Sequence, residues 1–405
     1  MVDKIKILIA LLILAGASSC RNNNTVPDII PKKQWYKGNL HTHSYWSDGD
    51  EFPEVILDWY KTRGYQFVSL SDHNTLAEGE KWKAIPADSV YQNAFNAYLA
   101  TYGLDWVNYK IESGQTYVKL KTYQEYRDLT EEKDKFLVIQ AEEITDKYED
   151  KHLHMNATNI QERIDPQGGN SVSEVLQNNL DQVIDQSKRT GVPILPHINH
   201  PNFFYSISLE DMYSLEGERF FEVYNGHPMV HNMGDSTHIS TEEMWDLINI
   251  SYIEKKKPIM YGLATDDSHH YHKKGKKWSN AGRGWVMVQA DTLSAASLIN
   301  AMEEGKFYAS TGITLNTLKF ENNILSIQVA GEPGISYSID FIGLKKGNSK
   351  TSVLKSVSGI NANFELTNDI EFVRCKITSS KLHDNPIENI AHEMAWTQPL
   401  LRLQE

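Results

Sequence analysis

The sequence predicts an α/β protein with a barrel-type site, followed by a small antiparallel β domain. Short apolar runs alternate with helical patterns from about residue 35 to residue 312. Polar residues follow many of these runs, and beyond residue 312 alternating strands and turns replace the helical patterns. A chain of 405 residues is long enough for one large domain and a smaller partner.

The first 20 residues read as an export signal. Lys4 and Lys6 precede an apolar run from Ile7 to Leu14, and small residues then lead to Cys20. The apolar run is too short to span a bilayer comfortably, which favours a signal peptide over a transmembrane helix. The small residues before Cys20 resemble a bacterial lipobox. This resemblance implies that Cys20 is lipidated, becomes the mature N-terminus and anchors an exported protein to a bacterial membrane.

The composition of the rest of the chain indicates a tether and limits both the class of partner and the disulfides that can form. Residues 21–34 are polar, rich in Asn and contain two prolines, which suits a tether between a membrane and a domain. The formal charge of −13 argues against a general nucleic-acid coat, since phosphate binding needs a basic face. Cys375 is the only other cysteine, so the body of the chain forms no internal disulfide, and its alternating apolar surroundings predict burial.

The secondary structure follows from apolar periodicity. Residues 53–63 read as a helix, because Pro53 stands near the start and Gly64 lies just past the end. Buried parallel strands are expected at residues 67–70, 136–139, 192–195, 220–223, 259–262 and 285–288. Antiparallel strands are expected at residues 325–329 and 337–341 in the C-terminal domain.

Polar side chains collect directly after the predicted strands. These residues are His41, His73, Glu142, Glu143, His197, His200, Asn225, Asp267 and His269. Polar chemistry at the C-terminal ends of parallel strands is typical of a barrel-type active site.

Residues Asn39 to Gly49 read N-L-H-T-H-S-Y-W-S-D-G and indicate metal binding. His41 and His43 are spaced i, i+2 on an extended segment, so both imidazoles point the same way and can bind one ion. The candidate ligands offer only nitrogen and oxygen. Such a set suits Mn, Fe or Zn without choosing among them.

Several motifs occur in an order that resembles one superfamily. H-T-H followed by S-D-G, then S-D-H-N, E-I-T and D-S-H, resembles the metal-binding set of the polymerase and histidinol phosphatase (PHP) superfamily over residues 35–312. The resemblance implies a distorted (β/α)7 barrel with two or three divalent metal ions, followed by the β-rich domain of residues 313–405. G-N-L-H-T-H, F-E-V-Y-N-G-H-P and G-R-G-W resemble a branch of exported or uncharacterised metallohydrolases. Some members of that branch are named for ester or carbamate hydrolysis.

The resemblance also implies a ligand set. The nine implied ligands are His41, His43 and Asp267 for a first metal, Glu143 as a bridge to a second metal, His154 and His200 for the second, and Asp48, His73 and His269 for a third.

Two of these assignments have alternatives within the sequence. Glu142 and Glu143 alternate across a strand, so only one faces the site, and the A-E-E-I-T match favours Glu143. His152 lies on the same side of an extended segment as His154, but the H-M-N-A context of His154 fits the motif better.

Further residues are candidates for contact with the substrate. The strand predicted at residues 192–195 would bring His197 to the site if it simply continued, whereas His200 has the H-P-N context typical of the family. We therefore expect His200 to be the ligand and His197 to contact a ligand or the substrate. Arg283, flanked by glycines, could bind a phosphate bidentately or form a loop salt bridge. His270 could face the substrate. His227, His231, His238 and His272 are expected to be solvated loop residues. The lysines of residues 273–277 are expected to be a solvated loop, with contact to a polyanion as the alternative.

The predicted activity is metal-dependent hydrolysis of a small or terminal phosphoester, with a metal-bridging hydroxide as nucleophile. Ester, amide or carbamate hydrolysis at the same metals is the alternative, as is a 5′–3′ exonuclease-like action on nucleic-acid ends. A metal-bearing surface protein without turnover ranks last, because no ligand of the set is missing. The membrane is expected as a partner through the lipid, and nothing in the sequence indicates a protein partner.

Overall fold

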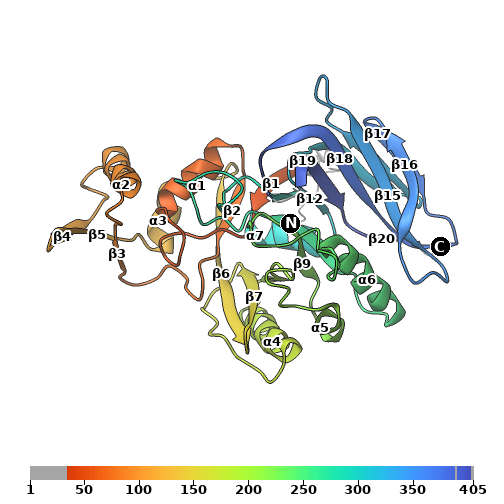
Figure 1. Cartoon of the computed structure of the whole chain (residues 1–405), viewed down its shortest axis with the longest axis horizontal. Coiled ribbons are helices and arrows are strands. Elements are labelled where there is room, and N and C mark those ends of the chain that lie inside the picture. Colours follow the sequence, from red (N-terminus) through yellow and green to blue (C-terminus); the bar gives the residue numbers. More distant parts are fainter. Residues whose placement is uncertain (1–33, 388–389, 403–405) are drawn as a thin grey trace, which may run out of the picture. The chain divides into compact units, whose positions relative to one another are not determined.

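A mixed 14-stranded sheet runs through the computed structural model, which describes residues 34–387 and 390–402 (Figure 1). Its strand order is β10-β9-β8-β7-β6-β2-β1-β11-β12-β19-β18-β15-β16, with β20 paired to β18. The strands of this sheet are β1 (Gln34–Asn39), β2 (Phe67–Leu70), β6 (Leu137–Tyr148), β7 (Lys151–Thr158), β8 (Leu195–Ile198), β9 (Phe220–Asn225), β10 (Tyr261–Thr265), β11 (Trp285–Ala290), β12 (Phe307–Ser310), β15 (Tyr337–Lys345), β16 (Ser352–Ser358), β18 (Ile370–Ile387), β19 (Ile390–Thr397) and β20 (Leu400–Leu401).

The described residues form seven α-helices, most of which lie between strands of this sheet. They are α1 (Pro53–Thr62), α2 (Ser89–Tyr102), α3 (Tyr123–Thr130), α4 (Val172–Thr190), α5 (Leu209–Ser214), α6 (Thr241–Glu254) and α7 (Ala295–Glu303). Helix α1 begins at Pro53, whose fixed φ suits a first turn, and is followed by Gly64 with φ +75°. Helix α4 begins after Ser171, whose side chain accepts a backbone N–H, and ends at the left-handed Gly191. The expected helix at residues 53–63 is therefore confirmed.

The run from β10 to β1 carries the functional residues. Strands β1, β2 and β6 are parallel to one another, as are β8, β9 and β10, whereas β7 is antiparallel to both β6 and β8. A parallel bridge between Thr42 and Ser268 joins the segments that follow β1 and β10. The α/β class is confirmed. A (β/α)7 barrel is not, because β6 and β7 form a hairpin without an intervening helix.

Strand β9 shows how the alternation of side chains along a strand places residues in the core of the sheet. All six residues of Phe220–Asn225 are buried, as expected for a strand covered on both faces. Phe221 and Val223 pack in one core cluster with Trp245 of α6, and Phe220 belongs to a second cluster. Because successive side chains alternate, Glu222 lies on the same face as Phe220 and is carried into the interior.

Two strand predictions need correction, and one hairpin was not predicted. The strand predicted at residues 285–288 is β11, which is antiparallel to β1 rather than parallel; no crossover helix precedes it, and an antiparallel pair needs none. The strand predicted at residues 192–195 is Leu195–Ile198, so His197 lies within β8 instead of after it. The β6–β7 hairpin was not predicted, because its turn contains Glu149 at φ +54° where a glycine or asparagine usually signals such a turn.

An insertion between β2 and β6 adds a separate small sheet. Strands β3 (Trp82–Ala84), β5 (Gln115–Lys119) and β4 (Tyr109–Glu112) form this sheet next to α2, and in Figure 1 it lies at the left end of the view. Its buried residues join the core cluster that surrounds α1.

The residues after Gly312 are mainly strands, as expected. Strands β13 (Leu315–Glu321), β14 (Ile324–Val329) and β17 (Asn361–Glu365) form a three-stranded sheet that shares a hydrophobic cluster with β15 and β18. Cys375 of β18 is buried in this cluster, as predicted. The large sheet continues from β12 into β19 and β18. No helix among the described residues is long and apolar enough to cross a membrane, and Cys20 with the predicted signal and tether lies outside the described residues, apart from Gln34.

Candidate metal centre

The nine predicted ligands come together at one end of the β1–β10 run. They follow β1 (His41, His43 and Asp48), follow β2 (His73), lie within β6 and β7 (Glu143 and His154), follow β8 (His200) and follow β10 (Asp267 and His269). The parallel bridge between His73 and Glu143 extends the β2–β6 pairing into this region. The strand-end positions noted in the sequence thus converge in space, although β6 and β7 carry their ligands within the strand.

The Glu143 carboxylate lies at the centre of the cluster. The nearest imidazole nitrogens are His73 Nδ1 at 2.9 Å, His154 Nδ1 at 3.0 Å, His43 Nε2 at 3.2 Å and His41 Nε2 at 3.4 Å from its two oxygens. One carboxylate is therefore shared by side chains from three separate segments, which is the position a bridging ligand requires.

The Asp267 carboxylate forms a second centre beside it. His41 Nε2 and His43 Nε2 each lie 3.3 Å from Asp267 Oδ1, which agrees with the i, i+2 spacing placing both rings on one side. His200 Nε2 lies 3.9 Å from Asp267 Oδ2 and 3.5 Å from Glu143 Oε1. His200 therefore connects the two carboxylates.

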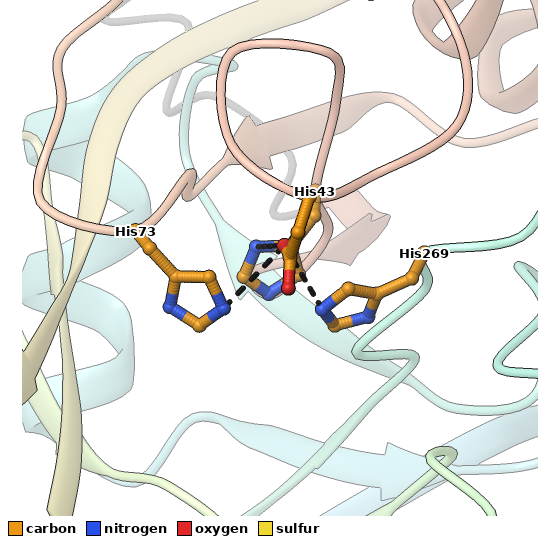
Figure 2. A group of neighbouring side chains, drawn as sticks. His43, His73 and His269 are labelled. Carbon is orange, nitrogen blue, oxygen red and sulfur yellow. Dashed lines mark ion pairs between the residues drawn. The ribbon is translucent and has the colours of Figure 1, made fainter. Parts of the chain in front are cut away.

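The third group surrounds Asp48. Asp48 Oδ1 lies 3.3 Å from His269 Nε2, 3.5 Å from His73 Nε2 and 3.8 Å from His43 Nδ1. Figure 2 shows the rings of His43, His73 and His269 turned toward one another from separate segments. The Asp72 carboxylate steadies this part by accepting bonds from Ser44 and Ser47 of the loop that carries Asp48.

Glu222 fixes the orientation of His41. Its Oε1 lies 2.7 Å from His41 Nδ1, which leaves Nε2 facing Glu143 and Asp267. His197, predicted as a contact to a ligand or substrate, is fully buried with Nε2 3.5 Å from the same Glu222 oxygen. Among the described residues, the ion pair of His197 is thus with Glu222, the residue that orients His41.

The structure decides between the two pairs of alternative ligands, Glu142 or Glu143 and His152 or His154. Glu142 points away from the cluster and accepts the backbone N–H of Ile164, whereas Glu143 faces the histidines. His152 is exposed, and its ring centroid lies 6.3 Å from that of His154, which contacts Glu143 directly. Glu143 and His154 are therefore the members of each pair that reach the cluster.

Electrostatics make the cluster attractive to a cation. Burial alone would raise the pKa of the Glu143 carboxyl, but His73, His41 and His154 hold it well below its usual range. Burial alone would lower the pKa of His41, but Asp267, Glu222 and Glu143 hold it well above its usual range. The carboxylates thus stay ionised and favour protonated imidazole rings beside them. A metal ion can take the position of those ring protons.

The donor atoms fit a metal. His41 Nε2, His43 Nε2, Glu143 Oε2 and both nitrogens of His154 are buried, and among the described residues their close contacts are with other members of the cluster and lack hydrogen-bond geometry. Buried polar atoms without a partner cost free energy, and a coordinated cation relieves that cost. Five groups of three or four residues have ligand atoms within 4.8 Å of one another, and together they contain all nine predicted ligands plus His197 and Glu222. The number of metals and their identity stay predictions.

Two residues predicted to contact the substrate do not reach the cluster. Arg283 is fully buried, and its guanidinium donates five hydrogen bonds to oxygens of the protein, so it has no donor left for a phosphate. His270 packs on Trp278 with ring centroids 4.8 Å apart and lines a cavity of about 650 Å³ that none of the nine ligands lines. Both predictions are corrected. The glycine-flanked arginine closes a loop, and the residue after His269 turns away from the centre.

Sequence reasoning missed three residues at the centre. Asn199 donates to Glu143 Oε1 at 2.7 Å. Phe203 lies with its ring centroid 5.0 Å from that of His200, and the half-buried His227 lies 5.6 Å from His269. His227 was predicted to be solvated, but burial lowers its pKa to about 4. The signal that could have found it is its position directly after β9.

No family model matches the chain, and no curated protein matches its sequence. Among solved structures, a two-domain protein from Bacteroides vulgatus with a predicted PHP-like metal-dependent phosphoesterase is 13% identical, with 91% of this chain and 96% of that chain covered and a TM-score of 0.39. A proposed metal-dependent phosphoesterase from Bifidobacterium adolescentis is 12% identical, with 60% and 91% covered and a TM-score of 0.29. An amidohydrolase from Chromobacterium violaceum, with bound sulfate and no metal, is 11% identical, with 67% and 96% covered and a TM-score of 0.29. Similarity at this level leaves the activity to be inferred from the residues of this chain.

Proposed function

We propose that this chain is a metal-dependent hydrolase of the PHP type that cleaves a small or terminal phosphoester. The observation that supports the proposal is the group of buried nitrogen and oxygen atoms around Glu143 that lack hydrogen-bond partners. His41, His43 and Asp267 would hold one ion, Glu143, His154 and His200 a second, and Asp48, His73 and His269 a third. Bound divalent ions supply a nucleophile at neutral pH and stabilise charge on the scissile group.

The chain itself keeps these side chains in position. Glu222 accepts from His41 Nδ1 and from the backbone N–H of His200 at 2.9 Å, so one carboxylate orients two ligands. Asn225 donates to Asp267 Oδ2 at 3.1 Å and to Glu222 Oε2 at 2.8 Å. Such outer contacts fix ring orientation and ligand basicity, and their loss typically costs about 10-fold to 100-fold in metal affinity or activity.

Hydrolysis of a carbonyl ester, amide or carbamate is a second candidate. The observation that favours it concerns charge. Among the described residues, the ion pairs of the nine ligands involve only one another and Glu222, with no Lys or Arg. Arg283 is also unavailable, so a phosphate would depend on the metals for its neutralising charge.

A substrate panel on metal-reconstituted protein tests these proposals. Chelated protein would be loaded with Mn, Fe or Zn and assayed with a phosphomonoester, a phosphodiester, a dinucleotide, an aryl ester and an aryl carbamate. We expect turnover to require metal and to be fastest with the phosphomonoester. Preferred turnover of the ester or carbamate would select the second candidate, and activity that survives chelation without bound metal would refute both.

The ionic strength of the assay separates small substrates from nucleic-acid ends. An enzyme that follows a polymer contacts several phosphates, and its binding weakens steeply with salt. Because the net charge is −13 and no Lys or Arg of the described ranges pairs with the ligand cluster, we expect KM to change little between low and physiological salt. A steep dependence, abolished by replacing the lysines of residues 273–277, would instead indicate a nucleic-acid substrate.

A further inference from the structure

A line of rings crosses the candidate metal centre from the second ligand group to the third. The Phe203 ring lies 5.0 Å from the ring of His200 and 6.2 Å from that of His154. The His227 ring lies 5.7 Å from Phe203 at an interplanar angle of 84° and 5.6 Å from His269 at 71°. His227 is thus held edge-on between an aromatic side chain and a candidate ligand.

The two nitrogens of His227 have different surroundings. Nδ1 accepts the backbone N–H of Met229 at 3.2 Å, so the neutral ring carries its hydrogen on Nε2. Nε2 has no hydrogen-bond partner in the part of the chain that the structure describes. The backbone N–H of His227 donates to Asn225 Oδ1 at 2.7 Å, and the Asn225 side chain also donates to Asp267. The ring is therefore tied to the centre at its backbone, while one donor stays free.

After burial, the charged groups with the largest effect on the pKa of His227 belong to the candidate ligand set. They are Asp267, His269, His200 and His43. None of the five candidate metal groups includes His227, and each is complete without it. A half-buried donor that borders the ligands without joining them occupies the position of a substrate contact.

We propose that His227 Nε2–H donates a hydrogen bond to the leaving-group oxygen of the substrate. The proposal rests on the hydrolase function above. As the scissile bond to that oxygen breaks, negative charge develops on the oxygen, and a fixed donor stabilises it more in the transition state than in the ground state. No proton transfer is required of the ring, because hydrogen bonding alone supplies the stabilisation.

Two substitutions separate the free donor from the loop contact. Asparagine places an oxygen near the position of Nδ1, so His227→Asn keeps an acceptor for Met229 and loses the donor. Glutamine extends further and places its amide NH₂ near the position of Nε2, so His227→Gln keeps the donor and loses the acceptor. His238→Gln, an exposed histidine paired with Asp235 away from the ligands, is the control for loss of a histidine.

We expect His227→Asn to lower kcat/KM by about 100-fold for a substrate with a poor, alkyl leaving group, as for removal of one oxyanion donor. The loss should be less than about 10-fold for a 4-nitrophenyl leaving group, which needs little stabilisation. His227→Gln should stay within about 5-fold of wild type for both substrates, and metal content should be unchanged throughout. Equal losses for both leaving groups, a larger loss in Gln than in Asn, or loss of metal in Asn would overturn the proposal.

Binding of inorganic phosphate supplies a readout without turnover. Calorimetry on the metal-loaded protein should show about 10-fold weaker phosphate binding in His227→Asn, and binding close to wild type in His227→Gln and His238→Gln. Equal phosphate affinity in the Asn and Gln variants would overturn the role of His227. If phosphate binding ranks the variants in this way but the metal-loaded wild type turns over no substrate, the hydrolase function is refuted and the contact between His227 and an anion stands.

Discussion

Replacing Arg283 with methionine should destabilise the fold rather than weaken substrate binding. Its guanidinium donates to Gly226 O at 2.8 Å, Trp278 O at 2.6 Å, Gly275 O at 3.1 Å, and Asn385 O and Oδ1 at 3.0 and 3.1 Å. Methionine fills similar volume but leaves these acceptors without their donor. Each unsatisfied buried acceptor costs about 1 to 3 kcal/mol, but water and loop movement recover part of the sum. We expect a net loss of about 3 to 5 kcal/mol in the free energy of unfolding, the usual cost of breaking a buried charged contact.

Urea unfolding followed by circular dichroism measures this loss, with Arg163→Met as the matched control. Arg163 is exposed and pairs only with neighbouring groups, so its replacement should change the free energy of unfolding by less than about 1 kcal/mol. Arg283→Lys keeps the charge without the planar fork, and its stability should lie between those of wild type and Arg283→Met. An Arg283→Met protein as stable as wild type, with a raised KM for phosphoesters, would refute the structural role and restore the predicted phosphate clamp.

Three further predictions follow from the centre, the core and the N-terminus. Glu143→Gln should lower turnover by more than about 100-fold and reduce the metal content. Glu142→Gln, on the opposite face of β6, should leave turnover and metal content unchanged. If kinetics and elemental analysis gave the reverse ranking, the assignment of Glu143 to the face of β6 that carries the ligands would be wrong. Burial raises the pKa of Glu218 to about 8, so the folded state holds its proton and loses stability as pH rises from about 4.5 through 8. The free energy of unfolding of Glu218→Gln, relative to that of wild type, should therefore rise on the order of a few kcal/mol between pH 5 and pH 9. If the urea midpoints of the two proteins differed by the same amount at every pH, ionisation of Glu218 would be excluded. Cys20→Ser should release the protein from membranes or leave an unprocessed precursor, and unchanged fractionation and processing would exclude lipidation.

The sequence predicted those parts of the centre that depend on local spacing. His41 and His43 lie at i, i+2, and both Nε2 atoms reach the same oxygen of Asp267. Alternation across a strand explains why Glu143 faces the histidines while Glu142 accepts a backbone N–H on the other side. Both inferences need only the period of an extended chain, which is a property of neighbouring residues.

The structure differs from the sequence predictions for two reasons, a contact between distant residues and a turn without its usual residues. Arg283 looked available because glycines flank it, yet its partner Asn385 lies 102 residues further along the chain. The β6–β7 hairpin has no glycine at its turn, so its pairing depends on register across the whole of both strands, from Ala141 with Thr158 to Tyr148 with Lys151. The Arg283 contact lies outside any window of local sequence, whereas the hairpin is local and was missed because its turn carries no glycine signal.

The same long-range contacts explain how the chain holds Asp267 in a strained conformation. Asp267 has φ +48°, a left-handed conformation that costs a non-glycine residue on the order of 1 to 3 kcal/mol. The carboxylate of the preceding residue, Asp266, is buried and accepts the backbone N–H groups of Gly282, Arg283 and Gly284 at 2.6 to 2.8 Å, together with the Tyr60 hydroxyl at 2.7 Å.

These four bonds offset the strain at Asp267, since an intramolecular hydrogen bond contributes about 0.5 to 1.5 kcal/mol net. The Arg283 side chain then ties the same loop to β18 through Asn385. Each of these contacts is made by groups of the chain itself, and together they form the frame that presents Asp267 to His41 and His43. The G-R-G sequence, whose arginine was a candidate phosphate contact, therefore serves the centre by positioning the segment that carries Asp267 and His269.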